Sequence, residues 1–166
     1  MKLLRLLGGW FVIVASMGLL SCSAVPTQAP SIEGTYRLVS RKLPDGRVQT
    51  PPEAIGLMTF TKTHRNMNVM VTDASGKHFS LSQVSMYKLS GGEYSETLLY
   101  QVVTDQISGK GTTYNTSSRT QSSPVAMQAG RLQFKFPFET PSGTFEGDKL
   151  TATTPNGLVA VWEKVP

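Results

Sequence analysis

The stretch Arg131–Phe138 (RLQFKFPF) alternates polar and apolar residues along its whole length. Leu132, Phe134, Phe136 and Phe138 occupy one phase of this alternation, so in an extended chain they would share one face. A period of two over this length is typical of a β-strand with one buried face and one solvated face. The stretch therefore predicts a strand and favours a β-rich fold.

Weaker alternation of the same kind recurs before and after this stretch, and turn-forming sequences separate the segments. The clearest turns are Pro44-Asp45-Gly46, Asp73-Ala74-Ser75-Gly76 and Pro155-Asn156-Gly157. The further strands that we predict cover residues 34–40, 57–61, 67–72, 77–87, 93–104, 150–153 and 158–165. No helical period of useful length follows the N-terminal apolar segment.

We expect about eight to ten short strands in one domain over residues 32–166, which suits a closed barrel or a sandwich. A single small antiparallel β-barrel is the favoured fold, because closure leaves no exposed sheet edge. The apolar phase switches between Leu81 and Val84, which predicts a β-bulge near Ser82-Gln83. The polar, Ser/Thr-rich segment 107–123 is predicted to be a mobile loop.

The first residues have the pattern of an export signal. Lys2 and Arg5 precede an apolar stretch, 6–20, which is shorter than the ~20 residues that a membrane-spanning helix needs. Leu19-Leu20-Ser21-Cys22 then resembles the lipobox of bacterial lipoproteins. We expect residues 1–21 to be a lipoprotein signal peptide and residues 22–31 to be an acylated cysteine and a flexible tether. Cleavage after Ala24 by ordinary signal peptidase and an uncleaved helical anchor are the two alternatives.

The lipobox resemblance implies where the protein resides. Cleavage before Cys22 would leave a thiol that carries diacylglycerol and an amine that carries a further acyl chain such as palmitate. Several chains anchor a protein far better than one, because each buried CH₂ adds ~0.8 kcal/mol. The residue after the cysteine is Ser23, whereas a signal for retention in the inner membrane would have Asp at that position. We therefore expect a lipid-anchored protein of the cell envelope, on the outer membrane and facing the periplasm.

Charge and cysteine content limit the kinds of function and stabilisation that we expect. The chain has 16 Lys and Arg against 11 Asp and Glu, a net charge of +5 that falls to about +3 without Lys2 and Arg5. The cations are scattered, and no basic stripe interleaved with aromatic residues predicts a nucleic-acid surface. Cys22 is the only cysteine, so the mature domain is expected to have no disulfide and to depend on packing for its stability.

The strand segments resemble the bacterial lipocalin-like domain family. The matching stretches are Gly34–Ser40 (GTYRLVS), Gly56–Thr61 (GLMTFT), Leu150–Pro155 (LTATTP) and Leu158–Val165 (LVAVWEKV). The resemblance implies a barrel with an interior cavity for a small ligand, and it does not imply an enzyme. In lipocalins proper, a Trp in the first strand closes the barrel floor against a cation from the end of the chain. Here Tyr36 takes the place of that Trp, and Lys164 is the nearest cation on the final strand.

No catalytic or metal-binding constellation stands out. His64 and His78 are the only histidines, whereas a zinc site needs three or four ligands at close quarters. No Gly-x-Ser-x-Gly elbow is present, and the stretch 109–112 (GKGT) lacks the spacing of a phosphate loop. Most carboxylates lie in or beside turns, where we expect solvated side chains that set turn geometry: Asp45, Glu53, Asp73, Glu93, Glu96, Asp105, Glu139, Glu146 and Asp148. We therefore expect no enzyme, metal or cofactor.

Candidates for a ligand pocket come from the apolar phases of the predicted strands. They are Tyr36, Met67, Val69, Leu98, Tyr100, Phe134, Phe136 and Trp162. Aromatic rings and flexible Met side chains give shape-tolerant apolar contact, and the Tyr100 hydroxyl is the best inward polar group. A small barrel can be filled by its own side chains or can hold one small ligand. Two functions therefore remain open: a carrier of a small apolar or amphipathic molecule, or a structural lipoprotein with a filled barrel that contacts an envelope protein.

Overall fold

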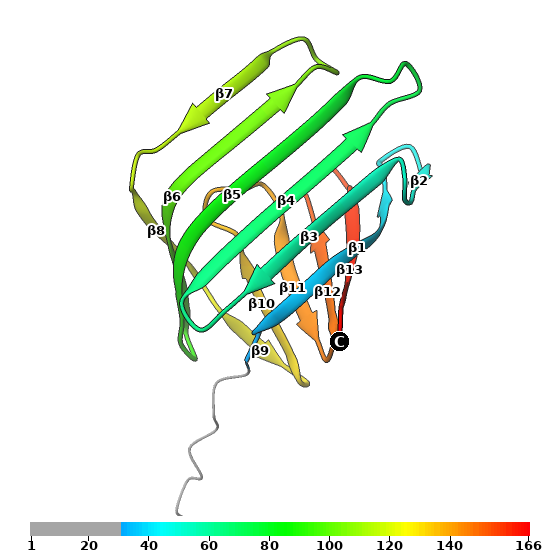
Figure 1. The fold of residues 1–166 in the computed structure, drawn as a ribbon. Helices are drawn as coiled ribbons and strands as arrows, with labels where there is room; N and C mark the ends of the chain where they lie inside the picture. Colours follow the sequence, from blue (N-terminus) through cyan, green and yellow to red (C-terminus); the bar gives the residue numbers. More distant parts are fainter. Residues whose placement is uncertain (1–30) are drawn as a thin grey trace, which may run out of the picture.

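The computed structural model describes residues 31–166, and it builds them as one curled antiparallel sheet that forms a half-barrel (Figure 1). The all-β prediction is confirmed. The described chain has thirteen strands, more than the eight to ten predicted, because several short strands extend or flank the long ones. The predicted signal peptide, Cys22 and the tether up to Pro30 lie outside the described residues.

The strands are β1 (Gly34–Lys42), β2 (Val48–Gln49), β3 (Ala54–Phe60), β4 (His64–Thr72), β5 (His78–Leu89), β6 (Glu93–Asp105), β7 (Gly111–Asn115), β8 (Thr120–Pro124), β9 (Ala126–Gln128), β10 (Arg131–Lys135), β11 (Ser142–Glu146), β12 (Lys149–Thr153) and β13 (Val159–Lys164).

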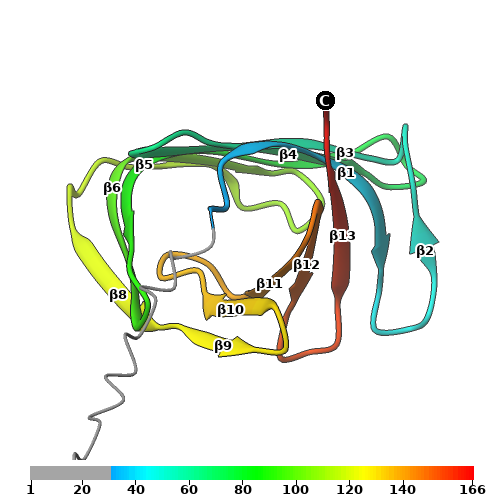
Figure 2. The ribbon, with the colours of Figure 1, turned by 90° about the horizontal axis from the view of Figure 1, so that it is seen from below.

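Neighbouring strands in the sheet are mostly consecutive in the chain, as in an up-and-down barrel. β3 to β6 form one meander, β9 to β13 form another, and β1 joins them by pairing with both β3 and β13. On the opposite side, β8 pairs with the first half of β6, while β9 pairs with β10. Only Val125 separates β8 from β9, so one segment of chain joins the two meanders there (Figure 2). The second half of β6 pairs with β7 instead, and at that level the sheet remains open.

The end of the barrel at which β1 begins is filled by aromatic side chains. This aromatic base consists of Tyr36, Phe60, Tyr87, Tyr94, Phe134, Phe136 and Phe145, all of them buried. Tyr94 and Phe134 stack with ring centroids 4.1 Å apart, and Tyr36 meets Phe60 edge-on at 6.1 Å. Such ring pairs add ~0.5–1.5 kcal/mol each beyond the apolar area that they bury. This end of the molecule is therefore a packed core.

Tyr36 and Lys164 lie directly opposite each other in the pairing of β1 with β13. The Tyr36 hydroxyl donates a hydrogen bond to the Ile32 carbonyl, 3.1 Å away, so its buried polar atom is satisfied. The Lys164 side chain crosses over Gly34, where any Cβ would overlap it. Gly34 also has φ +140°, which side chains rarely adopt, so glycine is required here for two reasons.

The strand predicted over 131–138 ends three residues early. β10 stops at Lys135, and residues 136–141 turn back toward β11 with a hydrogen bond from Phe136 N–H to the Pro141 carbonyl. The alternation continued past the end of the strand because Phe136 is buried by folding into the barrel interior, not by pairing. Sequence alternation therefore gave the burial of Phe136 correctly and its backbone conformation wrongly.

The bulge predicted near Ser82-Gln83 is close in position, because the β5–β6 pairing shifts register between Val84 and Ser85, but the extra residue belongs to β6. β5 pairs with β4 without interruption, and the register shift lies in β6, between Leu98 and Tyr100. The apolar phase changes in the sequence because Gln83 and Ser85 are polar residues on the inner face of β5, where both are buried. A polar residue inside the barrel thus produced the pattern of a shifted strand.

The segment 107–123, predicted to be a loop, contains β7 and most of β8. β7 lies at the margin of the sheet, and its side chains are largely exposed. Threonine and tyrosine are enriched in strands, and β7 forms by pairing with the second half of β6. Polarity alone was therefore not evidence for a loop.

Candidate functional site

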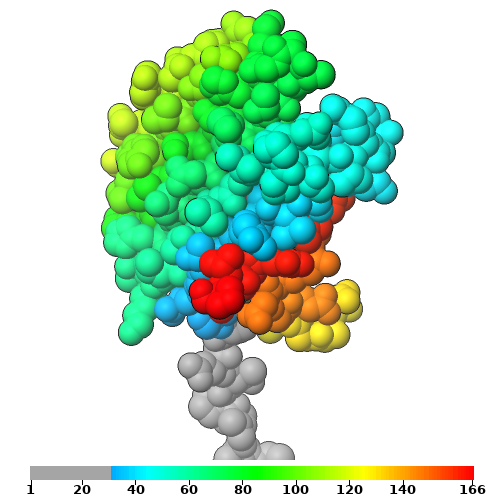
Figure 3. Space-filling view, turned by 45° about the vertical axis from the view of Figure 1, so that its right-hand side comes forward, coloured from blue at the N-terminus to red at the C-terminus, as the bar shows by residue number. Residues whose placement is uncertain are grey.

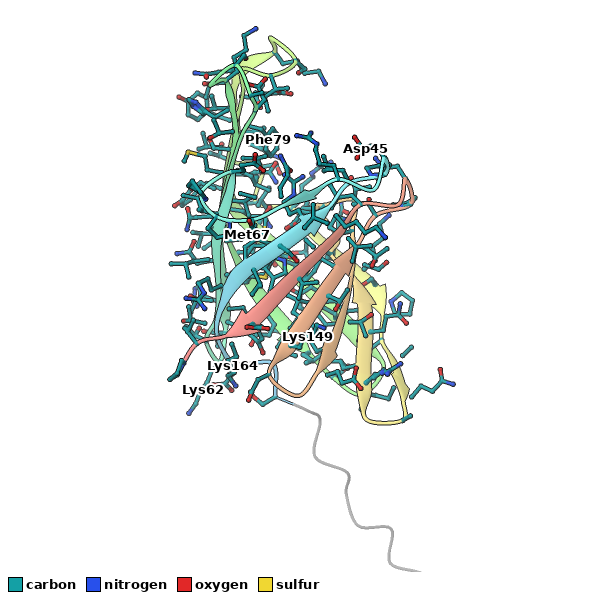
Figure 4. All side chains as sticks on the ribbon, turned by 90° about the vertical axis from the view of Figure 1, so that its right-hand side faces the viewer. Asp45, Lys62, Met67, Phe79, Lys149 and Lys164 are labelled. Carbon is teal, nitrogen blue, oxygen red and sulfur yellow. The ribbon has the colours of Figure 1, made fainter. Side chains whose placement is uncertain are left out.

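A cup of about 490 Å³ opens at the end of the barrel opposite the aromatic base. Its apolar walls are Leu38, Met58, Met67, Val69, Val71, Phe79, Leu81, Val103, Ala152, Leu158, Ala160 and Trp162. Met67 and Phe79, labelled in Figure 4, belong to β4 and β5, whose inner faces form one side of the cup. The polar residues of the lining are few, and they lie at its floor and rim.

The cup remains open because its walls carry smaller side chains than the aromatic base. Val69 of β4 pairs with Leu81 of β5, so the two side chains lie next to each other on the inner face. Across the cavity, Ala152 of β12 pairs with Ala160 of β13. Aliphatic and alanine side chains at these facing positions fill less volume than the rings below them. The hollow is thus a direct result of which residues occupy the inner phase.

The floor of the cup is the turn 136–141, which folds into the barrel between β10 and β11 (Figure 2). Phe136 is fully buried and joins the aromatic base. A Cβ at Gly143 would lie 2.9 Å from the Phe136 ring, so glycine at that position allows the ring to pack closely. The rest of the turn also lines the cup, through Phe138, Glu139, Thr140 and Pro141. This turn separates the packed half of the barrel from the hollow half.

A buried charge cluster fixes the turn in place. Arg65 of β4 is 1 % exposed, and its Nη1 lies 3.1 Å from Glu96 Oε1 and 2.6 Å from Glu139 Oε1. Its guanidinium also lies over the Phe136 ring, 4.3 Å from the centroid. Arg65 therefore contacts the turn 136–141 at two residues, Glu139 and Phe136.

Glu96 is the better satisfied of the two carboxylates. Besides Arg65, it accepts hydrogen bonds from Gln83 Nε2 at 2.9 Å and from the Tyr94 hydroxyl at 3.3 Å. Gln101 in turn donates to Gln83 Oε1 at 2.7 Å, which orients the Gln83 amide. By contrast, the contact of Glu139 Oε1 with Arg65 lacks hydrogen-bond geometry. Glu96 thus has several hydrogen-bond partners, whereas Glu139 has the closer contact with Arg65 but no hydrogen bond at its Oε1.

Two carboxylates share one guanidinium in this cluster. Burial by itself would lower the pKa of Arg65, but the charges of Glu139 and Glu96 outweigh burial and raise it. For Glu139, burial raises the pKa of the carboxyl, and the positive charge of Arg65 only partly opposes this effect. Burial likewise raises the pKa of Tyr94. The cluster can therefore become neutral by taking up one proton, at Glu139.

Sequence reasoning missed this cluster. The prediction that Glu96 and Glu139 are solvated turn residues is wrong, because both side chains are at least nine-tenths buried. The pattern did contain a clue: Arg65 shares a phase with Met67, and Glu96 lies between Tyr94 and Leu98 on another apolar phase. A charged residue on the buried phase of a strand requires a partner of opposite charge. Two such residues on separate strands could have been paired with each other.

The predicted pocket residues are divided between the two ends of the barrel. Met67, Val69, Phe136 and Trp162 line the cup. Tyr36 and Phe134 lie in the aromatic base, and Leu98 is buried beside the bulge in β6.

Tyr100 lies on the outer face of β6, 44 % exposed, so the prediction that its hydroxyl points inward is wrong. The reason is the bulge. Leu99 is the extra residue between Leu98 and Tyr100, and it shifts the alternation so that Leu98 faces inward and Tyr100 outward.

Arg41 of β1 lies at the rim of the cup. It pairs with Ala160 of β13 on one side and with Gln49 of β2 on the other, so all three share the inner face. Its Nη1 donates to Gln49 Oε1 over 3.4 Å, and Gln49 itself is buried. Among the described residues, no carboxylate lies within ion-pair distance of Arg41. Burial lowers the pKa of its guanidinium, as expected for a desolvated cation with no acid nearby.

A second hollow, about 780 Å³, lies on the outer face of the sheet. It is bordered by Pro51 and by outward side chains of β1, β3 and β4, among them Leu57, which is 50 % exposed. In Figure 3 the chain between β1 and β3 projects beside this part of the surface. The hollow is shallow and apolar, and it has none of the buried charges of the cup.

The two histidines do not form a site with each other. His64 is exposed and contacts the hydroxyl of Thr63, whereas His78 pairs with Thr72 at the other end of β4. Within residues 31–166, no three His, Cys, Asp or Glu side chains gather into a group that could hold a metal ion. The same part of the chain contains no helix long and apolar enough to cross a membrane.

No family model, curated protein or solved structure matches this chain.

Proposed function

We propose that this chain is a lipid-anchored lipocalin-like protein of the cell envelope whose barrel carries a small amphipathic molecule. The observation that carries the proposal is the cup: about 490 Å³, apolar on its walls, with few polar groups. Ligand sites in proteins typically have volumes of about 300–1,000 Å³ and this kind of lining. The closed floor beneath it gives a bound molecule one open end.

The direction of the cup agrees with anchoring through the preceding chain. The described residues begin at the closed end of the barrel, and the rim residue Arg41 lies near the other end of β1 (Figure 1). A tether that joins the closed end to Cys22 would leave the cup facing away from the membrane. Metabolic labelling with a radioactive fatty acid tests the anchor. We expect the wild type to be labelled and Cys22→Ser to be unlabelled and unprocessed, while an unlabelled wild type beginning at Val25 would refute it.

Extraction of the purified protein tests the cup itself. Organic solvent followed by mass spectrometry should release a recurrent amphipathic molecule from the wild type. Leu81→Trp would place a large ring in the cup and should abolish this co-purification, with the circular dichroism spectrum unchanged. Tyr100→Ala, on the outer face, is the matched control and should retain the molecule. Equal recovery from the wild type and from Leu81→Trp would show that the molecule is not held in the cup.

The outer hollow favours a second candidate function, an interaction lipoprotein of the envelope. Ile55, Leu57 and Met70 form an exposed apolar strip there, a feature typical of protein contact surfaces. An empty extract from the wild type, together with crosslinking to an envelope protein that Leu57→Asp abolishes, would favour this function over the carrier.

A further inference from the structure

We propose that Arg41, with Gln49, is an anion-recognition site at the rim of the cup, so that the carried molecule is an amphiphile with a carboxylate or phosphate headgroup. This inference rests on the proposed carrier function and specifies the charge of its ligand. The headgroup would lie at the rim and the apolar tail would extend along the walls toward Phe136.

The two arginines on the inner face of the barrel differ in their counter-ions. Arg65 has two carboxylates within 3.1 Å, whereas the one side-chain partner of Arg41 within residues 31–166 is the amide oxygen of Gln49, at 3.4 Å. Both guanidiniums are removed from water to a substantial degree, and a desolvated cation is costly unless an anion compensates it. The fold supplies that compensation at Arg65 and omits it at Arg41. An acidic ligand would provide the missing charge.

The carboxylate at the floor of the cup, Glu139, does not require a cation from a ligand in the same way. Glu139 is the carboxylate in excess there, but a carboxylate can become neutral by binding a proton. An arginine side chain remains protonated at any pH that proteins meet, so Arg41 has no such route. Among the charged groups described in the cup, Arg41 is therefore the one with neither a counter-ion nor a neutral form, which argues for an acid and against an amine.

The neighbours of Arg41 suit a headgroup that stays near water. Thr154 and Leu158, from either end of the turn between β12 and β13, also line the cup close to the Arg41 strand. The Gln49 side chain is buried, and its oxygen already receives the Arg41 bond, which fixes the direction of the guanidinium. Guanidinium groups bind carboxylates and phosphates through two parallel hydrogen bonds. An anion at the rim could thus be held while its tail lies in the apolar interior.

Calorimetric titration of the purified protein with dodecanoate, dodecyl phosphate, dodecanol and dodecyltrimethylammonium tests the inference. These probes share one tail and differ in the charge of the head. A charge-assisted hydrogen bond predicts that the two acids bind at least about ten-fold more tightly than dodecanol. In Arg41→Gln, that preference should fall to within about two-fold, with the affinity for dodecanol unchanged.

Two further variants control the experiment. Arg41→Lys keeps the charge and should keep part of the preference for acids. Arg47→Gln removes an exposed cation from the connection between β1 and β2 and should leave that preference intact. Wild-type binding that ignores the headgroup, or that favours the ammonium, would overturn the anion site while leaving the carrier function standing. An acid preference that survives in Arg41→Gln would also overturn it. If no probe binds, the carrier proposal fails as well.

Discussion

The two ends of the barrel are made from the same alternating strands but with different inward side chains. Toward the start of β1, seven buried aromatic residues meet edge to face and in stacks. Toward the end of β1, aliphatic and alanine side chains line a cup. The backbone register is continuous between β4 and β5 through both regions, so strand pairing does not account for the difference. Side-chain volume on the inner phase decides which end is packed and which end is hollow.

The boundary between these regions is polar. Arg65, Glu96 and Glu139 form it, with Gln83 and Gln101 completing the hydrogen bonds. Buried charges seldom add net stability when compared with a packed apolar core, but removing one partner is costly. The cluster therefore serves to hold the turn 136–141 in one position, and the experiments below separate its contribution from those of the two ends.

The largest effect is expected from Arg65→Met. It leaves two buried carboxylates without their cation, and we expect it to destabilise the protein by about 3–5 kcal/mol, as measured by urea unfolding. Arg131→Met is the matched control, because it breaks an exposed ion pair with Glu146; it should cost about 0–1 kcal/mol. Similar losses in the two variants would mean that the boundary is not a desolvated charge cluster.

The next comparison is between one side chain of the aromatic base and one of the cup. Phe134→Ala should leave a cavity in packed surroundings and cost about 3–5 kcal/mol. Leu81 faces the hollow and is only half-buried, so Leu81→Ala should cost less than about 2 kcal/mol. Urea unfolding of both variants measures the two costs. A loss at Leu81 as large as that at Phe134 would indicate that the cup is filled in solution.

The third prediction concerns pH. Burial raises the pKa of Glu139 above its usual value of about 4.5, so the folded state binds the proton more tightly than the unfolded state. This contribution to stability is fully present below about pH 4.5, and it is lost as the pH rises through the raised pKa. We expect the stability difference between the wild type and Glu139→Gln to shift against the wild type over that interval, by at most about 1.4 kcal/mol per pH unit. A difference that is constant with pH would contradict a buried Glu139 carboxyl.

The smallest effect is expected on the outside of the bulge. Tyr100→Ala should change the unfolding free energy by about 0.5 kcal/mol or less, because the side chain lies on the outer face and contributes nothing to the buried core. Leu98→Ala, two residues earlier and fully buried, should cost about 2–5 kcal/mol. Thermal or urea unfolding distinguishes the two, and equal costs would place the bulge elsewhere in β6.

The alternation at 131–138 was sufficient to predict the fold class, because burying one face of a strand requires apolar residues at every second position. The same rule failed at buried polar residues and at the bulge. Gln83 and Glu96 are polar residues on the inner face. Gln83 therefore led to the prediction of a bulge in its strand, and Glu96 was predicted to be a solvated side chain. Tyr100 was misplaced because a single extra residue in a bulge, Leu99, reverses the phase that follows it. These features depend on partners from other strands, which a local pattern does not contain.

The surroundings of Arg41 are another feature that a local sequence pattern does not contain. The strand predicted over 34–40 stops one residue short of Arg41, whereas β1 continues to Lys42. The significance of Arg41 comes from its described neighbours, which include Ala160 and Gln49 but no carboxylate within ion-pair distance. Ala160 and Gln49 belong to β13 and β2, whereas the two carboxylates near Arg65 belong to β6 and to the turn 136–141. Only the folded arrangement distinguishes the arginine that is neutralised from the one that is not.

The floor of the cup is a connection between strands, the turn 136–141, whereas most of its walls are strand residues. Connections between strands tolerate insertion and deletion far better than the strands themselves. A protein engineer could therefore lengthen the cavity by shortening this turn and replacing Arg65 and Glu96 with apolar residues, with every strand register kept. If the barrel carries an amphiphile as we propose, the length of the tail that it accepts would then become an adjustable property, independent of the proposed headgroup site at the rim.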